Sequence, residues 1–196
     1  TFLWRAAGKP VVNYAMNFTD VDSGAYCAEA IRWAASEKIV EGTTAETFAP
    51  NAVVTRAQVV TVLYRMEGSP SVAGKTCPFE DNTASWSRDA IIWAYSTGVA
   101  KGYTDTIFAG SDSVTREQLA SFLYRYADKI VSGGTLKAPI SYADSFADAS
   151  SVSSYAVPAM RWANQNGIIT GKPGGLLDPL GGATRAEFAV MISRFV

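Results

Sequence analysis

The tetrapeptide Thr55-Arg-Ala-Gln58 decides how this chain folds, because the same pattern occurs three times. It returns as Thr115-Arg-Glu-Gln118 and as Thr184-Arg-Ala-Glu187. In each copy a Thr is followed three residues later by Gln or Glu. This is the capping box of a helix N-terminus, in which each of the two side chains accepts a hydrogen bond from the other residue's backbone amide. Apolar residues at helical spacing follow the first copy. The sequence therefore predicts three helices that begin in the same way.

Upstream of each capping box, a second helical stripe carries a Trp in constant register. The three residues are Trp33, Trp93 and Trp162, and we assign them to the core. Each stripe ends in a stop signal typical of a left-handed C-cap, at Lys38, Gly98 and Gly167. A Gly then follows each Trp at the same distance, at Gly42, Gly102 and Gly171. These glycines either end a turn that needs positive φ or let a ligand approach the backbone.

Each repeat opens with a Phe-x-Asp motif and an aromatic residue before the first helix. The acidic residues are Asp20, Asp81 and Asp148, and the aromatic residues are Tyr26, Trp86 and Tyr155. Between the two helices runs an irregular loop of roughly a dozen residues, a length that often indicates function. We expect an apolar residue to anchor each loop, at Phe48, Phe108 and Leu177.

Composition excludes several classes of function. The 196 residues have 48% hydrophobic content and a net charge of −1, so no broad field attracts nucleic acid or an anionic membrane. No apolar run approaches the roughly 20 residues of a membrane span. The absence of His excludes a His-dependent triad and a zinc-protease motif. Cys27 and Cys77 either form one disulfide or are two small apolar residues, and they cannot make a structural zinc site alone. We predict no cofactor, metal or catalytic residue.

The N-terminal stretch TFLWRAAGKP resembles residues 61–70, TVLYRMEGSP, so residues 1–10 are interpreted as the tail of a preceding repeat. We expect an excised fragment of a longer polypeptide, whose further domains are expected partners. Residues 1–7 are predicted to stay helical. Three full repeats follow, over residues 11–70, 71–131 and 132–196.

These motifs together resemble the S-layer homology (SLH) domain family over nearly the whole chain. The resemblance implies an all-α fold of three helix-loop-helix repeats, arranged as a pseudo-threefold, three-pronged spindle. It also implies a non-catalytic module that is extracellular and anchors surface proteins to an anionic secondary cell-wall polysaccharide. The acidic group is often a pyruvate ketal, which the family binds in grooves between repeats.

The arginine after each capping Thr is the residue that agrees with this function independently. Arg56, Arg116 and Arg185 occupy the first helical turn, where the helix dipole disfavours a cation. A helix N-terminus with free amides and an adjacent guanidinium suits a carboxylate ligand. The alternative is that these arginines pair with Asp20, Asp81 and Asp148 as structural struts. We expect the Arg56 and Arg116 grooves to bind, because their repeats keep the Phe anchor.

The sequence alone does not decide the role of the aromatic residue before each first helix, nor does it decide the class of function. Tyr26, Trp86 and Tyr155 either face a sugar ring or belong to the core. A helical-repeat scaffold for protein–protein interaction would also consist of tandem helix pairs. Three copies with the same arginine at the start of the second helix favour a closed array over such an open one. A glycosidase would need an asymmetric pair of carboxylates, and the repeated Asp residues do not provide one.

Overall fold

The computed structural model describes residues 12–142 and 144–196, so the expected helix over residues 1–7 lies outside the described part. The chain divides into two compact units. Unit 1 comprises Thr1–Val53 and Thr184–Val196, and unit 2 comprises Val54–Ala183. Strand structure in the described residues is limited to isolated bridges, so the prediction of an all-α chain is confirmed.

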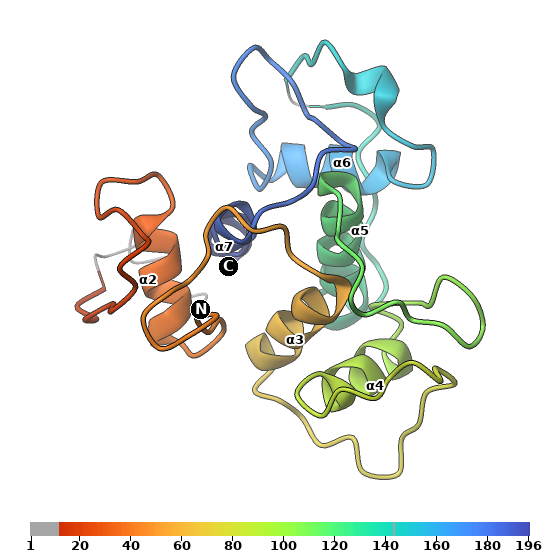
Figure 1. The fold of residues 1–196 in the computed structure, drawn as a ribbon. Coiled ribbons are helices and arrows are strands. Elements are labelled where there is room, and N and C mark those ends of the chain that lie inside the picture. Colours follow the sequence, from red (N-terminus) through yellow and green to blue (C-terminus); the bar gives the residue numbers. More distant parts are fainter. Residues whose placement is uncertain (1–11, 143) are drawn as a thin grey trace. The chain divides into compact units, whose positions relative to one another are not determined.

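Six α-helices and two single turns form the described structure (Figure 1). They are α2 (Ala28–Ser36), α3 (Arg56–Met66), α4 (Arg88–Ser96), α5 (Arg116–Tyr126), the π-helical turn η1 (Ala127–Val131), the 3-10 turn η2 (Ala149–Ser151), α6 (Val157–Gln165) and α7 (Arg185–Phe195).

The helix boundaries follow the signals in the sequence. Thr55, Thr115 and Thr184 each complete a capping box at the start of α3, α5 and α7. The expected left-handed residues after the first helices are also present. Gly98 has a φ of 76° and Gly167 has a φ of 67°. Lys38 has a φ of 57°, so this position needs the left-handed conformation even where no glycine supplies it.

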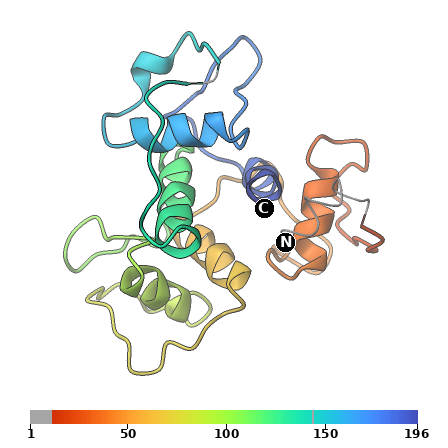
Figure 2. The same cartoon turned by 180° about the vertical axis from the view of Figure 1, so that it is seen from behind.

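Helices pack across repeat boundaries. In unit 2, α4 packs on α3 and α5 packs on α6, with α3 also touching α5. In unit 1, α2 packs on α7. The views from the front and from behind agree on these pairs (Figures 1 and 2). In unit 2 the two helices of the second repeat, α4 and α5, thus pack on helices of the repeats before and after them.

The predicted core residues are buried. Trp33, Trp93 and Trp162 are all covered, and so are the three loop anchors Phe48, Phe108 and Leu177. In unit 2 the Trp93 ring packs against Tyr64 of α3 and Tyr126 of α5. Trp162 of α6 likewise packs against Tyr124 of α5, so in unit 2 both Trp residues contact the second helix of the repeat before them.

A closed ring of backbone hydrogen bonds joins three segments of unit 2. The Val54 amide donates to the Ala183 carbonyl, the Ala183 amide to the Val114 carbonyl, and the Val114 amide to the Val54 carbonyl, each at 2.9 Å. Each of these residues immediately precedes a capping Thr, so all three repeats contribute equally to the ring. The full three-pronged spindle stays a prediction.

Both cysteines are thiols in the structure, so the disulfide alternative is wrong. Cys27 is buried, as expected of a small apolar residue, and Cys77 is partly exposed. Within residues 12–142 and 144–196, no helix is long and apolar enough to cross a membrane.

Candidate functional site

An aspartate clamps the inter-helix loop of every repeat. Asp20 accepts hydrogen bonds from the amides of Phe48 and Ala49, at 2.8 and 2.7 Å. Asp81 holds Phe108 and Ala109 at the same distances. Asp148 holds Leu177 and Asp178, both at 2.8 Å. We call each arrangement an Asp clamp. It explains why a Phe-x-Asp motif opens each repeat.

The clamps at Asp20 and Asp148 favour the ionised carboxylate. The hydrogen bond from Phe48 lowers the pKa of Asp20, with desolvation acting against it. Burial raises the pKa of Asp148, but the bonds from Leu177 and Asp178 outweigh this effect, and the pKa is lowered overall. The charges of Arg185 and Arg116 contribute in the same direction to Asp20 and Asp148 respectively.

The three capping-box arginines hold the same loops from the other side. Arg56 Nε donates to the Phe108 carbonyl at 2.9 Å, and its Nη2 donates to Lys101 at 2.8 Å. Arg185 makes the same contacts in unit 1, where its Nε donates to the Phe48 carbonyl and its Nη2 to the backbone carbonyl of Glu41, both at 2.7 Å. In unit 2, Arg116 Nε donates to Leu177 at 2.8 Å.

This geometry corrects two expectations. Among the described residues, Arg56 and Arg185 form no ion pair with Asp81 or Asp20, because loop carbonyls take their hydrogen bonds instead. The alternative that pairs these two arginines with the aspartates is thus wrong about the partner. Moreover, Arg56 meets the anchor of the following repeat, Phe108, whereas Arg116 meets Leu177. The reason given for choosing Arg56 and Arg116 therefore does not hold for Arg116.

The first amides of the three helices are not free to bind an anion. In α3 the amides of Arg56 and Ala57 donate to the carbonyls of Asp112 and Gly110. The corresponding amides of α5 donate to Gly181 and Pro179, and those of α7 to Ala52 and Pro50. The expectation of an anion site on free helix amides is wrong, since the neighbouring loop satisfies these groups.

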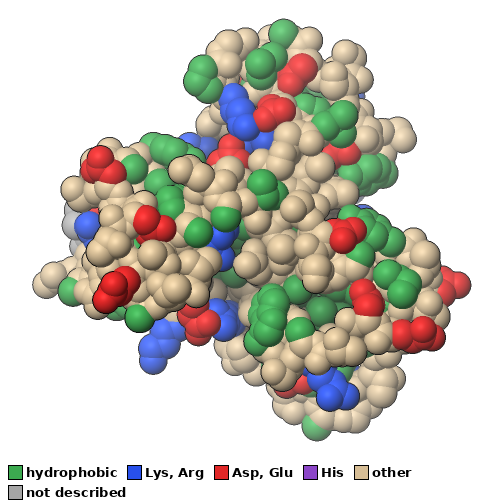
Figure 3. Space-filling view, in the orientation of Figure 1, with side chains coloured by type: hydrophobic (Ala, Val, Ile, Leu, Met, Phe, Trp, Pro, Cys, Tyr) green, Lys and Arg blue, Asp and Glu red, His purple; other side chains and the backbone are tan. Residues whose placement is uncertain are grey.

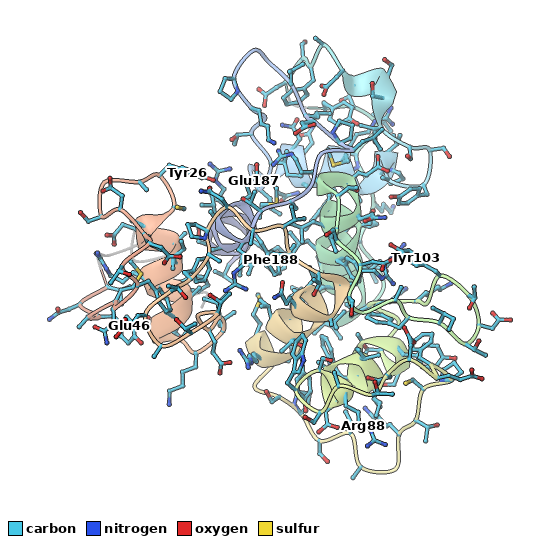
Figure 4. All side chains as sticks on the ribbon, in the orientation of Figure 1. Tyr26, Glu46, Arg88, Tyr103, Glu187 and Phe188 are labelled. Atoms are coloured by element: carbon cyan, nitrogen blue, oxygen red, sulfur yellow. The ribbon has the colours of Figure 1, made fainter. Side chains whose placement is uncertain are left out.

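The Arg56 guanidinium lies among aromatic rings. Its Cζ atom is 4.2 Å from the centroid of Tyr103, 4.7 Å from Phe108 and 5.4 Å from Phe122 of α5. Arg56 is only 5% exposed, and burial lowers its pKa. Tyr103, by contrast, is 51% exposed and lies beside α5 (Figure 4). Cation and ring thus form a stack with one face toward solvent.

Arg125 adds a second cation near this stack. It follows Phe122 by three residues, so the two side chains share one face of α5. Arg125 is partly buried, and desolvation lowers its pKa while Tyr155 raises it. Its charge also acts on Arg56. Within the described part of the chain, no hydrogen bond or ion pair engages its guanidinium, which therefore keeps its donors available.

The loop that meets Arg116 carries different side chains at the equivalent positions. Lys172 stands where the second repeat has Tyr103, and its Nζ pairs with Asp178 at 2.6 Å. Asp178 has a φ of 50°, and its carboxyl group lies so close to Gly181 that a Cβ there would clash with it. This loop closes on itself through an internal ion pair.

The three glycines in constant register serve packing. A Cβ at Gly42 would lie 2.6 Å from the Phe18 ring, and one at Gly102 would lie 2.5 Å from Phe79. One at Gly171 would lie 2.7 Å from Phe146. Positive φ applies only to Gly171, so the turn explanation is wrong for the other two. The Phe of each Phe-x-Asp motif fills the space beside the glycine.

The three aromatic residues before the first helices are exposed. Tyr26 is 72% exposed, Trp86 57% and Tyr155 53%, so the core alternative is wrong for all three. The hydroxyl of Tyr155 donates to Glu117 of α5, which places Tyr155 in unit 2.

Sequence reasoning missed Tyr103, Arg125 and Glu117. Tyr103 directly follows Gly102, and the corresponding residues Thr43 and Lys172 do not repeat its type. Glu117 breaks the repeat in the same way, because Ala57 and Ala186 occupy its position. Differences between copies were the available signal for Tyr103 and Glu117, whereas Arg125 is repeated as Arg65 and Arg194 and so gave no such signal.

Charged side chains are scattered over the visible surface among hydrophobic ones (Figure 3). In residues 12–142 and 144–196, no group of three or more Cys, Asp and Glu side chains could hold a metal ion.

Comparison with known proteins agrees with this repeated frame. An endoglucanase of Bacillus sp. (strain KSM-635) is 31% identical over 91% of this chain and 18% of its own length. The surface-layer 125 kDa protein of Lysinibacillus sphaericus is 29% identical over 87% of this chain and 14% of its length. A cellulosome-anchoring protein of Acetivibrio thermocellus is 26% identical over 64% of this chain and 28% of its length. This chain thus spans less than a third of these relatives. The family model of the S-layer homology domain matches residues 17–60, 78–120 and 145–189, and the chain therefore belongs to the SLH domain family.

Proposed function

We propose that this chain is a non-catalytic module that anchors a larger protein to the cell wall at the cell surface. SLH domains anchor proteins to the cell wall, and this chain carries three SLH repeats. Its relatives include enzymes and surface-layer or anchoring proteins, and the matched segment is a small part of each. A segment shared by proteins with such different names is better explained by a common location than by a common reaction.

The ligand we propose is an anionic secondary cell-wall polysaccharide, with a pyruvate ketal as its acidic group. The observation that carries this proposal is the cluster of Arg56, Tyr103 and Arg125 in unit 2. Arg56 spends two of its five N–H donors on loop carbonyls, and Tyr103 covers its guanidinium. Arg125 keeps its donors for a carboxylate. Tyr103 offers an exposed ring to a sugar face.

Arg116 and Arg185 belong to the same proposal as equivalents at the other loops. Arg116 is 3% exposed, while Arg185 is more accessible and lies 4.4 Å from the centroid of Phe48. The Asp clamps and the three glycines hold the loops in shape behind these arginines. We propose that the loops differ in ligand binding because their exposed side chains differ.

Binding to purified Gram-positive cell walls that carry a pyruvylated polymer tests this function. The chain should sediment with untreated walls and lose binding when mild acid has removed the ketals. Arg125→Gln should weaken binding and leave the melting temperature unchanged, because Arg125 holds no described residue by a hydrogen bond. Equal binding to treated and untreated walls would contradict an acidic ligand. Absence of binding to untreated walls would contradict the anchoring function itself.

A further inference from the structure

Glu117 is a buried carboxylate that the helix around it does not require. It lies in the first turn of α5 and is 2% exposed. The capping box of α5 is complete without it, since Thr115 and Gln118 supply both side chains. The sister helices α3 and α7 hold Ala57 and Ala186 at this position. Burial of a carboxylate is costly unless hydrogen bonds compensate, so its partners indicate its role.

Both oxygens of Glu117 engage the segment before α6. Oε1 accepts a hydrogen bond from the Tyr155 hydroxyl at 2.9 Å. Oε2 accepts one from the Ser153 amide, also at 2.9 Å. These charge-assisted bonds connect α5 to the third repeat at two points two residues apart. The carboxylate therefore restricts both the backbone before Tyr155 and the tip of its side chain.

Tyr155 combines an immobilised tip with an exposed ring. The residue is 53% exposed although its hydroxyl is held. An exposed aromatic side chain normally rotates, and ordering it on binding costs free energy. The Glu117 contact removes that cost in advance. Tyr155 lies near the proposed ligand cluster, close enough for the charge of Arg125 to act against the rise in the pKa of its phenol.

We propose that Glu117 is a positioning residue, which holds Tyr155 as a stacking platform for a sugar ring of the polymer next to the acidic sugar at the Arg56–Tyr103–Arg125 cluster. This inference rests on the proposed function. It gives the site in unit 2 a second sugar position, and it explains why only α5 carries a glutamate there. The position therefore contributes to how many sugars the module recognises.

Affinity for the untreated walls, measured with the 196-residue chain, tests this inference. Glu117→Ala installs the residue that both sister helices carry, so we expect a folded protein. Its affinity should fall on the order of fivefold, because Tyr155 must then be ordered on binding. Tyr155→Leu should lose about tenfold, since the ring itself is gone. The double variant should bind no more weakly than Tyr155→Leu, because Glu117 acts through that ring.

Thr115→Ala serves as the matched control. It removes the cap of the same helix and lowers stability without touching Tyr155. Its affinity should stay within about twofold of the wild type, or roughly 0.4 kcal/mol, because Glu117 and Tyr155 are both unchanged. An equal loss of affinity in Thr115→Ala and Glu117→Ala, at matched melting temperatures, would reduce Glu117 to a structural role and overturn the inference.

Two further outcomes would also overturn it. One is normal binding by Tyr155→Leu. The other is an equal effect of Glu117→Ala with and without Tyr155. If Arg125→Gln still weakens binding in these cases, the proposed function survives and only the second sugar position fails. If the wild type itself fails to bind the walls, both proposals fail together.

Discussion

The loops that meet Arg56 and Arg116, both in unit 2, share one backbone frame and differ in the side chains exposed on it. In each, an Asp clamp holds two loop amides and an arginine Nε takes the anchor carbonyl. On this frame the second repeat places Tyr103 over its arginine, whereas the third repeat places Lys172 in an ion pair with Asp178. The frame is thus repeated for folding, while the exposed residues determine what each loop can bind.

The most damaging change should be one that breaks the frame itself. Gly102→Ala would put a Cβ 2.4 Å from the Thr104 carbonyl and 2.5 Å from the Ile107 carbonyl, neither of which can move cheaply. We expect a loss of about 3 kcal/mol or more in the free energy of unfolding, measured by urea denaturation.

Gly98→Ala is the matched control for that substitution. Gly98 has positive φ but no close neighbours, and Lys38 occupies its position in the first repeat. Its cost should be about 1 kcal/mol, from backbone strain alone. Similar costs for the two substitutions would show that close packing does not define the frame.

Removal of an Asp clamp should have the next largest effect, and it should be similar in the two loops. Asp81→Ala and Asp148→Ala each remove two hydrogen bonds from loop amides. We expect each to cost about 2 kcal/mol in urea denaturation, or about 1 kcal/mol per bond, because both carboxylates are at least partly exposed. If one variant were nearly neutral and the other severely destabilised, the two loops would not share a frame.

Substitutions in the two loops should differ in their effect on wall affinity, although clamp substitutions in the two loops cost similar stability. Tyr103→Ala should weaken wall binding about tenfold, or ~1.4 kcal/mol, because the stacked ring and its sugar-facing surface are lost. Lys172→Ala should change affinity by about twofold or less, since Asp178 already neutralises that lysine in an exposed ion pair. Cosedimentation with walls over a range of protein concentrations measures both. Equal losses would mean that both loops bind, and the comparison would fail.

The sequence predicted the frame better than the site, for a physical reason. The capping boxes, buried Trp residues and loop anchors are local or periodic requirements, and each is repeated three times. The packing of helices from different repeats depends on the path of the long loops between them, and no local sequence pattern specifies that path. Tyr155 belongs to the same repeat as Arg185 in sequence, yet it contacts Glu117 of α5. The first amides of α3, α5 and α7 were predicted to be free for a ligand, but carbonyls of a loop distant in sequence accept their hydrogen bonds.

Low pH should reduce the free energy of unfolding slightly, which is the smallest of the expected effects. It tests whether the charge of Asp148 contributes to its clamp. The pKa of Asp148 is lowered in the folded chain, since hydrogen bonds from Leu177 and Asp178 outweigh burial and Arg116 adds its charge. A carboxylate with a depressed folded pKa contributes stability above its unfolded value of about 3.9, and this contribution is lost as the pH falls through the folded pKa. The urea midpoint should therefore decline below about pH 4.

Asp148→Asn should show a smaller decline over the same range, because the titrating group at this clamp is gone. Parallel declines in wild type and variant would assign the acid sensitivity to other carboxylates, such as Asp20, whose pKa is also lowered by its loop amides. The Asp148 clamp would then hold its loop equally well with a neutral side chain, and geometry rather than charge would account for the repeated aspartate.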